Sequence, residues 1–303
     1  MSNTLGFLTM PKFGFYLMGE KGYNSLLKLL DHVDASNISF VVTARDLNVK
    51  KDFYCEIFSL CEEWNVLCFD RSSSIVLDAD YFFAISWRWL IKSHENLIVF
   101  HDSLLPKYRG FAPLVNALVN GENNIGVTAL FADGKYDTGG IISQLSISVE
   151  YPIKIQDAIQ KVSCLYSELL INIVKCILNN STLVCHVQDE SQATYSPWRD
   201  ENDYFINWYD SSEKISRFVD ATGYPYLGSK TKIDADVINI SEVSVVQDVV
   251  VENRSNHIGK VLFIDNDCPV VICGSGLLKI TAMSDSNGRS LIGEIPFRTR
   301  FGK

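Results

Sequence analysis

Residues 98–113 have the sequence Ile98-Val-Phe-His101-Asp-Ser-Leu-Leu-Pro106-Lys-Tyr-Arg109-Gly110-Phe-Ala-Pro113. The apolar run that begins at Ile98 predicts a buried strand ending at His101, and the following Leu-Leu-Pro106 turns the chain. Pro113 is suited to the first turn of a helix. This stretch therefore predicts a strand, a turn and a helix, with a histidine at the carboxyl end of the strand.

The same alternation of strand and helix patterns extends along the first half of the chain. Further apolar runs predict strands at 13–18, 38–43, 66–69, 81–85, 96–100 and 126–131. Helical spacing occurs at 23–30, 53–64 and 155–178. Fully apolar strands that alternate with helices are typical of an α/β fold with a doubly wound, mostly parallel sheet. Ligands of such sheets bind beyond the carboxyl ends of the strands, where His101 is expected.

The second half of the chain has a different pattern. Periodicity is lost over residues 180–200, so we place a domain junction there and expect domains 1–198 and 199–303. The later part predicts a short helix at 211–221 and strands at 237–240, 261–264, 270–273 and 277–281. These elements favour a smaller β-rich C-terminal domain, barrel-like or OB-like in form.

Composition and charge narrow the class of protein. The 303 residues are 47% hydrophobic and 21% charged, which is typical of a globular chain. The net charge of −9 argues against a nucleic-acid partner, because phosphate backbones select basic surfaces. The eight cysteines include no C-x-x-C pair and favour a reduced, cytoplasmic protein. We expect no signal peptide and no membrane contact, because no apolar run approaches the roughly 20 residues that span a bilayer.

A second polar residue could join His101 at the edge of the sheet. Asp137 follows the strand expected at 126–131 and precedes Thr138-Gly-Gly140, whose glycines allow close approach of the backbone. A histidine and an aspartate from neighbouring strand ends can form a titratable base with an orienting carboxylate. Such a pair is more often structural, so the spacing alone leaves both interpretations open.

A longer composite pattern resembles a known family. The segments HDSLLPKYRGFAP at 101–113, NGE at 120–122, GVT at 126–128 and DTGGIISQ at 137–144 resemble the signature of the formyltetrahydrofolate-dependent formyltransferases. The resemblance extends upstream to residues 86–91 and downstream to segments between 199 and 225. It implies a Rossmann-like formyltransferase domain, N10-formyltetrahydrofolate as co-substrate, and no metal.

The resemblance also implies roles for individual residues. His101 would be the general base and proton shuttle, with Asp137 as its partner, because the attacking amine must lose a proton and the folate nitrogen must gain one. The folate is expected to contact Ser86, Trp87, Arg88, Leu90, Leu105 and Asp133. The acceptor substrate is expected to contact Ser103, Lys107, Arg109 and Gly110.

One position departs from the family pattern. The family usually has asparagine two residues before the histidine, where its amide supports the formyl oxygen, and this chain has Val99. Loss of one such donor typically costs on the order of 10²–10³ in rate. Asn116, Asp102 and Ser103 are nearby candidates to replace the donor, and we expect the site to have been rebuilt around Val99.

Family members differ in the amine that they formylate. The acidic net charge counts against a methionyl-tRNA acceptor, and the second domain counts against glycinamide ribonucleotide. A nucleotide-linked amino sugar with a UDP, dTDP or GDP carrier remains, for surface polysaccharide or glycan biosynthesis. The alternatives are a non-catalytic nucleotide-sugar-binding module with a degenerate centre, a methionyl-tRNA formyltransferase-like enzyme, and a hydrolase that releases formate. A homodimer is a further expectation.

Overall fold

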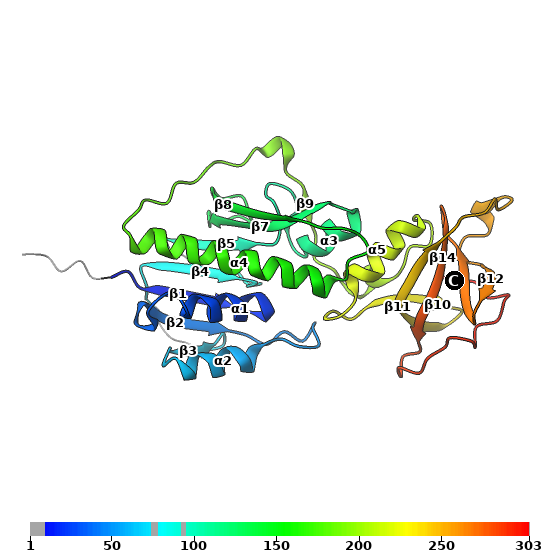
Figure 1. The fold of residues 1–303 in the computed structure, drawn as a ribbon, viewed down its shortest axis with the longest axis horizontal. Helices are drawn as coiled ribbons and strands as arrows, with labels where there is room; N and C mark the ends of the chain where they lie inside the picture. The colour runs from blue at the N-terminus through cyan, green and yellow to red at the C-terminus, as the bar shows by residue number, and fades with distance from the viewer. Residues whose placement is uncertain (1–9, 74–77, 92–94, 303) are drawn as a thin grey trace, which may run out of the picture.

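The computed structural model describes residues 10–73, 78–91 and 95–302. Its N-terminal half is built on a seven-stranded sheet with the order β3-β2-β1-β4-β5-β7-β8 (Figure 1). The first five strands are parallel: β1 (Phe13–Leu17), β2 (Ile38–Thr43), β3 (Cys68–Asp70), β4 (Tyr81–Ile85) and β5 (Leu97–His101). Two antiparallel strands, β7 (Asn124–Phe131) and β8 (Ile141–Ser148), complete the sheet beside β5. The expected mostly parallel α/β sheet is confirmed.

Four helices pack into one large apolar core on a single face of this sheet. They are α1 (Gly19–Leu30), α2 (Tyr54–Glu63), α3 (Pro113–Asn120) and α4 (Ile155–Leu178). The core-facing strand residues alternate along β1 and β5, as in Phe13, Phe15 and Leu17. The opposite face has a smaller apolar cluster around Phe40, Phe82 and Leu97, to which Trp87 and Val99 also belong.

The order of the strands leaves a crevice at the carboxyl edge of the sheet. β1 lies between β2 and β4, so the chain winds outward in opposite directions from the β1–β4 boundary. Crevices form at such reversals because the connections leave the sheet toward opposite sides. His101, the last residue of β5, lies one strand away from this boundary.

The C-terminal half is an antiparallel sheet with the order β10-β11-β14-β13-β12. The strands are β10 (Ser229–Ile233), β11 (Asp236–Val246), β12 (Val261–Asp265), β13 (Cys268–Ile272) and β14 (Leu277–Ser284). Its core contains Trp208, Val271 and Leu278 and is separate from the core of the N-terminal sheet. The expected β-rich C-terminal domain is therefore confirmed, while the exact boundary at 198/199 stays a prediction.

Helix α5 (Ser212–Thr222) lies between the two halves of the molecule (Figure 1). Ile215 and Val219 belong to the core of the C-terminal sheet, whereas Ala221 belongs to the core of the N-terminal half. Polar contacts reinforce this placement: Lys154 Nζ lies 2.6 Å from Asp220 Oδ1, and Arg217 Nε donates to Val119 O at 3.1 Å. The helix thus joins the two cores.

Two further observations concern the whole chain. All eight cysteines lie among the described residues, and all are free. Within residues 10–73, 78–91 and 95–302, no helix is both long enough and apolar enough to cross a membrane.

Candidate active site

A cavity of about 1060 Å³ opens at the carboxyl edge of the N-terminal sheet. One wall comes from the ends of β1, β4 and β5 and from the first turn of α1. Trp198, Arg199 and the turn around Tyr224 and Tyr226 also line the cavity. The backbone N–H of Lys50 donates to Pro225 O at 3.0 Å, which links the N-terminal half to that turn.

His101 lines this cavity, and one of its ring nitrogens forms a hydrogen bond with the protein backbone. The residue is only 6% exposed, and Nε2 lies 2.7 Å from the backbone carbonyl oxygen of Tyr108. A carbonyl oxygen can only accept, so Nε2 must be the protonated nitrogen. The neutral ring therefore has its lone pair on Nδ1. Nδ1 is the atom at which His101 can take up and release a proton.

Asp137 faces that atom. Its Oδ2 lies 3.5 Å from His101 Nδ1 and accepts a hydrogen bond of 2.8 Å from the backbone N–H of Gly110. Gly110 has a φ of +99°, and a Cβ there would lie 2.7 Å from Ser196 O, so the position requires glycine. Asp137 is thus held beside the imidazole ring of His101.

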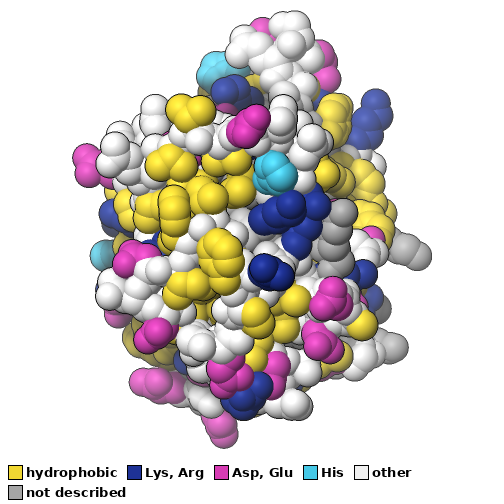
Figure 2. Space-filling view, turned by 90° about the vertical axis from the view of Figure 1, so that its right-hand side faces the viewer, with side chains coloured by type: hydrophobic (Ala, Val, Ile, Leu, Met, Phe, Trp, Pro, Cys, Tyr) yellow, Lys and Arg dark blue, Asp and Glu magenta, His cyan; other side chains and the backbone are white. Residues whose placement is uncertain are grey.

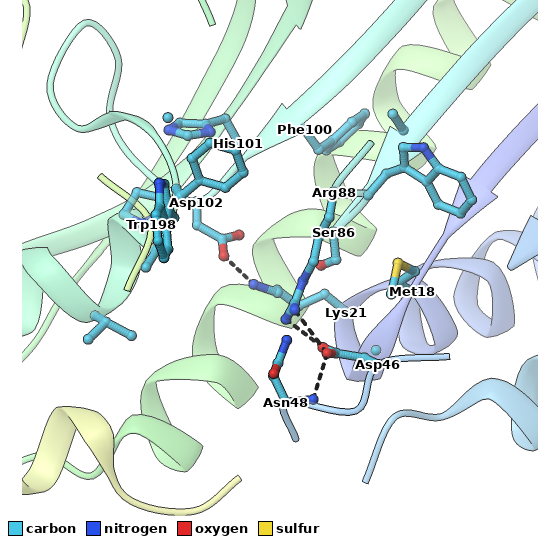
Figure 3. A pocket seen from close by; sticks show the side chains of 18 of the residues that line it. Met18, Lys21, Asp46, Asn48, Ser86, Arg88, Phe100, His101, Asp102 and Trp198 are labelled. Atoms are coloured by element: carbon cyan, nitrogen blue, oxygen red, sulfur yellow. Dashed lines mark hydrogen bonds and ion pairs between the residues drawn. The ribbon is translucent and has the colours of Figure 1, made fainter. Parts of the chain in front are cut away.

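A second polar cluster lies directly after His101. Asp102 Oδ2 forms an ion pair with Lys21 (Figure 3). Asp102 Oδ1 accepts a hydrogen bond from the Tyr166 hydroxyl. Burial acts to raise the pKa of Asp102, but Lys21, Tyr166 and His101 together lower it below its ordinary value. Burial, followed by the Asp102 charge, raises the pKa of Tyr166 well above its ordinary value. The cluster is therefore a lysine ammonium, a carboxylate and a neutral phenol.

Val99 also lines the cavity, and none of the three expected substitutes supplies a free donor there. Ser103 Oγ donates to Lys107 O at 2.6 Å, and the ionised Asp102 can only accept. The Asn116 amide is bonded to Ser196 and Arg199 and does not line the cavity. The wall beside His101 is thus apolar at this position.

Five of the six residues expected at the folate line the cavity: Ser86, Trp87, Arg88, Leu90 and Asp133. Ser86 Oγ is buried and has no hydrogen-bond partner among the described residues. Arg88 Nη1 donates to Asp46 Oδ1 at 2.9 Å (Figure 3). Leu105, the sixth residue, is buried away from the cavity, where its N–H donates to Thr128 Oγ1 at 3.1 Å.

The four residues expected at the acceptor are not brought together. Gly110 lines the cavity, but Ser103, Lys107 and Arg109 do not. Lys107 is exposed, with Nζ 3.7 Å from Glu122 Oε1, and Ser103 is buried in its own turn. Arg109 is fully buried, and its guanidinium is paired with Glu190 and Gln188 rather than exposed to a ligand. These three positions are therefore placed to hold the loop, contrary to our expectation from the sequence.

Sequence reasoning missed residues that reach the site from distant segments. Gln188 donates to the backbone carbonyl of Asp137 at 2.8 Å, although 51 residues separate the two in the sequence. Asp102 stood next to His101 in the sequence, but its partners come from α1 and α4. The one signal in the sequence was the position of Asp102 at the end of a predicted buried strand. A buried carboxylate needs a partner of opposite charge, so a lysine or arginine could have been expected nearby.

Comparison with known protein families agrees with this architecture. The family model described as "Formyl transferase" matches residues 71–174, and "Formyl transferase, C-terminal domain" matches residues 199–298. Together the two models cover both halves of the chain. The chain belongs to the formyl transferase family.

Curated relatives include methionyl-tRNA formyltransferases. That of Acetivibrio thermocellus is 33% identical over 195 residues, which are 64% of this chain and 61% of the relative. That of Syntrophomonas wolfei is 32% identical over 186 residues, or 59% of this chain and 56% of the relative. The chain thus matches less than two thirds of the length of these relatives.

Solved structures share the fold over a greater length. A sugar 3N-formyltransferase, WlaRD, crystallised with dTDP and 5-N-formyl-THF, has a TM-score of 0.66 at 19% identity, covering 90% of this chain and 97% of that one. The N-formyltransferase of Helicobacter canadensis, crystallised with folinic acid and dTDP-3-aminofucose, has a TM-score of 0.65 at 18% identity, covering 89% and 99%. At these identities the likeness establishes the fold.

Proposed function

We propose that this chain transfers the formyl group of N10-formyltetrahydrofolate to the amine of a nucleotide-linked amino sugar. The reaction would serve the synthesis of a surface polysaccharide or another glycan in the cytoplasm. The observation that carries the proposal is the pairing of His101 Nδ1 with Asp137 Oδ2, 3.5 Å apart, at the wall of a cavity between two domains.

The chemistry needs one group that moves a proton in both directions. As the amine nitrogen bonds to the formyl carbon, it loses a proton, which His101 Nδ1 takes up. The bond between the formyl carbon and the folate N10 then breaks, and the same proton passes to N10. Asp137 stabilises the protonated ring between the two steps, and the bond from Nε2 to Tyr108 O fixes the ring plane.

Residues on the cavity wall near Val99 fit a folate. Trp87, Leu90 and Leu97 supply an apolar surface for a flat ring system. The unpartnered Ser86 Oγ provides a hydrogen-bonding group for a polar ring edge. The described residues therefore offer both kinds of contact that a pterin ring requires.

Positively charged side chains that line the cavity support the proposal of a small, negatively charged acceptor. Lys135 and Lys230 line the cavity and form no salt bridge among the described residues, so their charges are available to a diphosphate. Tyr224 and Tyr226 also line the cavity, and aromatic rings can stack on a nucleobase. A homodimer stays a prediction.

A second candidate is transfer to methionyl-tRNA. The relatives at 33% and 32% identity carry that name, and the C-terminal half has a local basic surface. In Figure 2, which looks onto this half, Lys and Arg side chains gather beside a histidine and a hydrophobic area. Lys260 Nζ lies 2.9 Å from His257 Nδ1, and Arg300 Nε donates to Ile258 O at 2.9 Å. The net charge of −9 nevertheless favours the smaller acceptor.

The deciding experiment measures tetrahydrofolate release from N10-formyltetrahydrofolate with defined acceptors. The panel contains UDP-, dTDP- and GDP-linked amino sugars and, separately, charged initiator methionyl-tRNA. Mass spectrometry of the acceptor establishes that the formyl group has been transferred. We expect turnover with at least one amino-sugar nucleotide and none with the tRNA. Turnover with the tRNA alone supports the second candidate, and release without any formylated acceptor supports a hydrolase.

A further inference from the structure

Residues 186–196, part of the connection from α4 to the C-terminal half, are bonded to the loop that follows His101 and to the loop that carries Asp137. His186 and Ile141 exchange two backbone hydrogen bonds of 2.8 Å, which extends the edge of β8. The segment ends in β9 (Tyr195–Ser196), which pairs in parallel with β6 (Arg109–Gly110) in the loop after β5. Figure 1 shows this segment leaving α4 and returning along the N-terminal half to β9. We call residues 186–196 the connecting segment.

Gln188 makes the contact between this segment and Asp137. Its side chain is 5% exposed, and Nε2 donates to the backbone carbonyls of Asp137 and Gly139, each at 2.8 Å. Oε1 accepts from Arg109 Nε at 3.1 Å and from Arg109 Nη2 at 2.8 Å. A primary amide has two donor hydrogens and two acceptor lone pairs, so every one of them is used. Gln188 therefore joins the backbone of Asp137 to the guanidinium of Arg109.

Arg109, which is bonded to Gln188, is itself held in place. Its guanidinium is fully buried and forms two bonds with Glu190, from Nη1 at 2.8 Å and from Nη2 at 2.7 Å. A buried, bidentate guanidinium has little freedom to move. Arg109 lies on the loop that follows His101, so Gln188 links that loop to the loop of Asp137.

The connecting segment also reaches the His101 side of the pair. Thr194 Oγ1 accepts a hydrogen bond of 2.8 Å from Tyr108 N, and the carbonyl of Tyr108 accepts the bond from His101 Nε2. Asp137, at the other side, has a φ of +56°. That left-handed conformation is uncommon for residues other than glycine, although aspartate adopts it more readily than most, and bonds from outside the loop help to hold it. Gln188 supplies them at the carbonyls of residues 137 and 139.

We propose that Gln188 is a positioning residue for formyl transfer, acting through the backbone of Asp137 to hold its carboxylate opposite His101 Nδ1. The expected effect on kcat rests on the proposed function. Gln188 touches neither substrate, because it does not line the cavity. Its loss should therefore impair the chemical step and leave substrate binding nearly unchanged.

The test compares Gln188→Leu and Gln188→Glu with Gln192→Leu. The leucine variant removes all four bonds, whereas the glutamate variant keeps acceptors for Arg109 and removes both donated bonds. Gln192 is an exposed residue of the same segment and provides the matched control. Among the described residues its side chain is bonded only to Asp189 Oδ2, at 2.8 Å. Two quantities are measured: the kcat and KM of transfer, and the NMR signal of the His101 Hε1 proton, assigned by its loss in His101→Asn.

For both Gln188 variants we expect kcat to fall by roughly 10–100-fold, with KM for formyltetrahydrofolate within about twofold of wild type. The His101 signal should move in both variants and stay in place in Gln192→Leu. If Gln188→Leu does not fold, Gln188→Glu decides the question. A wild-type kcat, or an unmoved His101 signal in a folded Gln188 variant, overturns the proposal. The NMR comparison needs no acceptor, so it remains decisive if the proposed substrate is wrong.

Discussion

Val99 stands two residues before His101 on β5, and both side chains line the same cavity. Successive side chains of a strand point to opposite faces, so a residue two positions away shares a face. A polar group at residue 99 would therefore be well placed to donate to a formyl oxygen held near the ring. Valine offers no such donor, and Asn116, Asp102 and Ser103 are engaged elsewhere.

We predict that Val99→Asn increases kcat by roughly 10–100-fold, because it adds a donor for the developing negative charge. The amide would face the cavity and would not be buried without a partner. Val99→Ala is the control, since it opens space without a donor and should not accelerate transfer. Steady-state kinetics with a verified acceptor measure the effect. A Val99→Asn enzyme no faster than wild type means that some other group already supports the formyl oxygen.

His101→Asn should abolish transfer, with loss of more than roughly 100-fold in kcat, because no other group at this position can take up the proton. The fold should persist, since the ring belongs to the cavity wall and not to the central apolar core. The exposed His32→Asn serves as control. Circular dichroism and single-turnover kinetics are the measurements. Retention of more than about a tenth of wild-type turnover would contradict the role of general base.

Asp137→Asn should lower kcat by roughly 100-fold or more while both KM values change little. The amide has nearly the size of the carboxylate, but it lacks the charge that stabilises protonated His101 across 3.5 Å. Its oxygen can still accept from the Gly110 N–H, so the loop should keep its conformation. An unchanged kcat would show that Asp137 only maintains the loop.

Asp102→Asn should reduce the free energy of unfolding by about 3 kcal/mol at pH 7, because the largely buried Lys21 loses its counter-charge. The pKa of Asp102 is lowered in the folded state, so the unfolded chain binds the proton more readily. The stabilisation is therefore present above about pH 4 and is lost as the pH falls through the folded-state pKa. Urea unfolding at several pH values should show the wild-type advantage shrinking in acid.

The control for that experiment is Asp236→Asn. Asp236 is exposed at the start of β11 and forms no salt bridge among the described residues. Its replacement should shift the unfolding free energy by less than about 0.5 kcal/mol at any of these pH values. A constant difference between wild type and Asp102→Asn from neutral to acid pH would refute the pKa argument.

Elements with a continuous periodic pattern were predictable from the sequence. The prediction of a helix at 155–178 matches α4, whose 24 residues keep one apolar face throughout. The strands at 38–43 and 81–85 match β2 and β4, because both are buried and almost entirely apolar. Two edge strands were missed, although the edge strands β3 and β12 overlap the runs predicted at 66–69 and 261–264. β8 and β10 lie at the ends of their sheets and mix Ser, Gln, Lys and Thr with their apolar residues.

The candidate site was predictable only where local sequence determines it. His101 could be placed at a strand end from the apolar run before it, and Asp137 from the glycines after it. Gln188 and Tyr166 reach the site through tertiary packing, and no local pattern marks them as site residues. Arg109 was expected to contact the acceptor, but it is buried and paired with Glu190. The local sequence does not distinguish an arginine that binds a ligand from one that is buried in an ion pair.

Helix α5 restricts how the two halves of the molecule can move. Phe218 packs against both cores, with Val219 in one and Ala221 in the other. A swinging motion of the C-terminal half would expose one of these apolar surfaces to water and separate Lys154 from Asp220. Substrates should therefore enter and leave through the mouth of a cavity with nearly immobile walls, and turnover should not depend on a hinge between the domains.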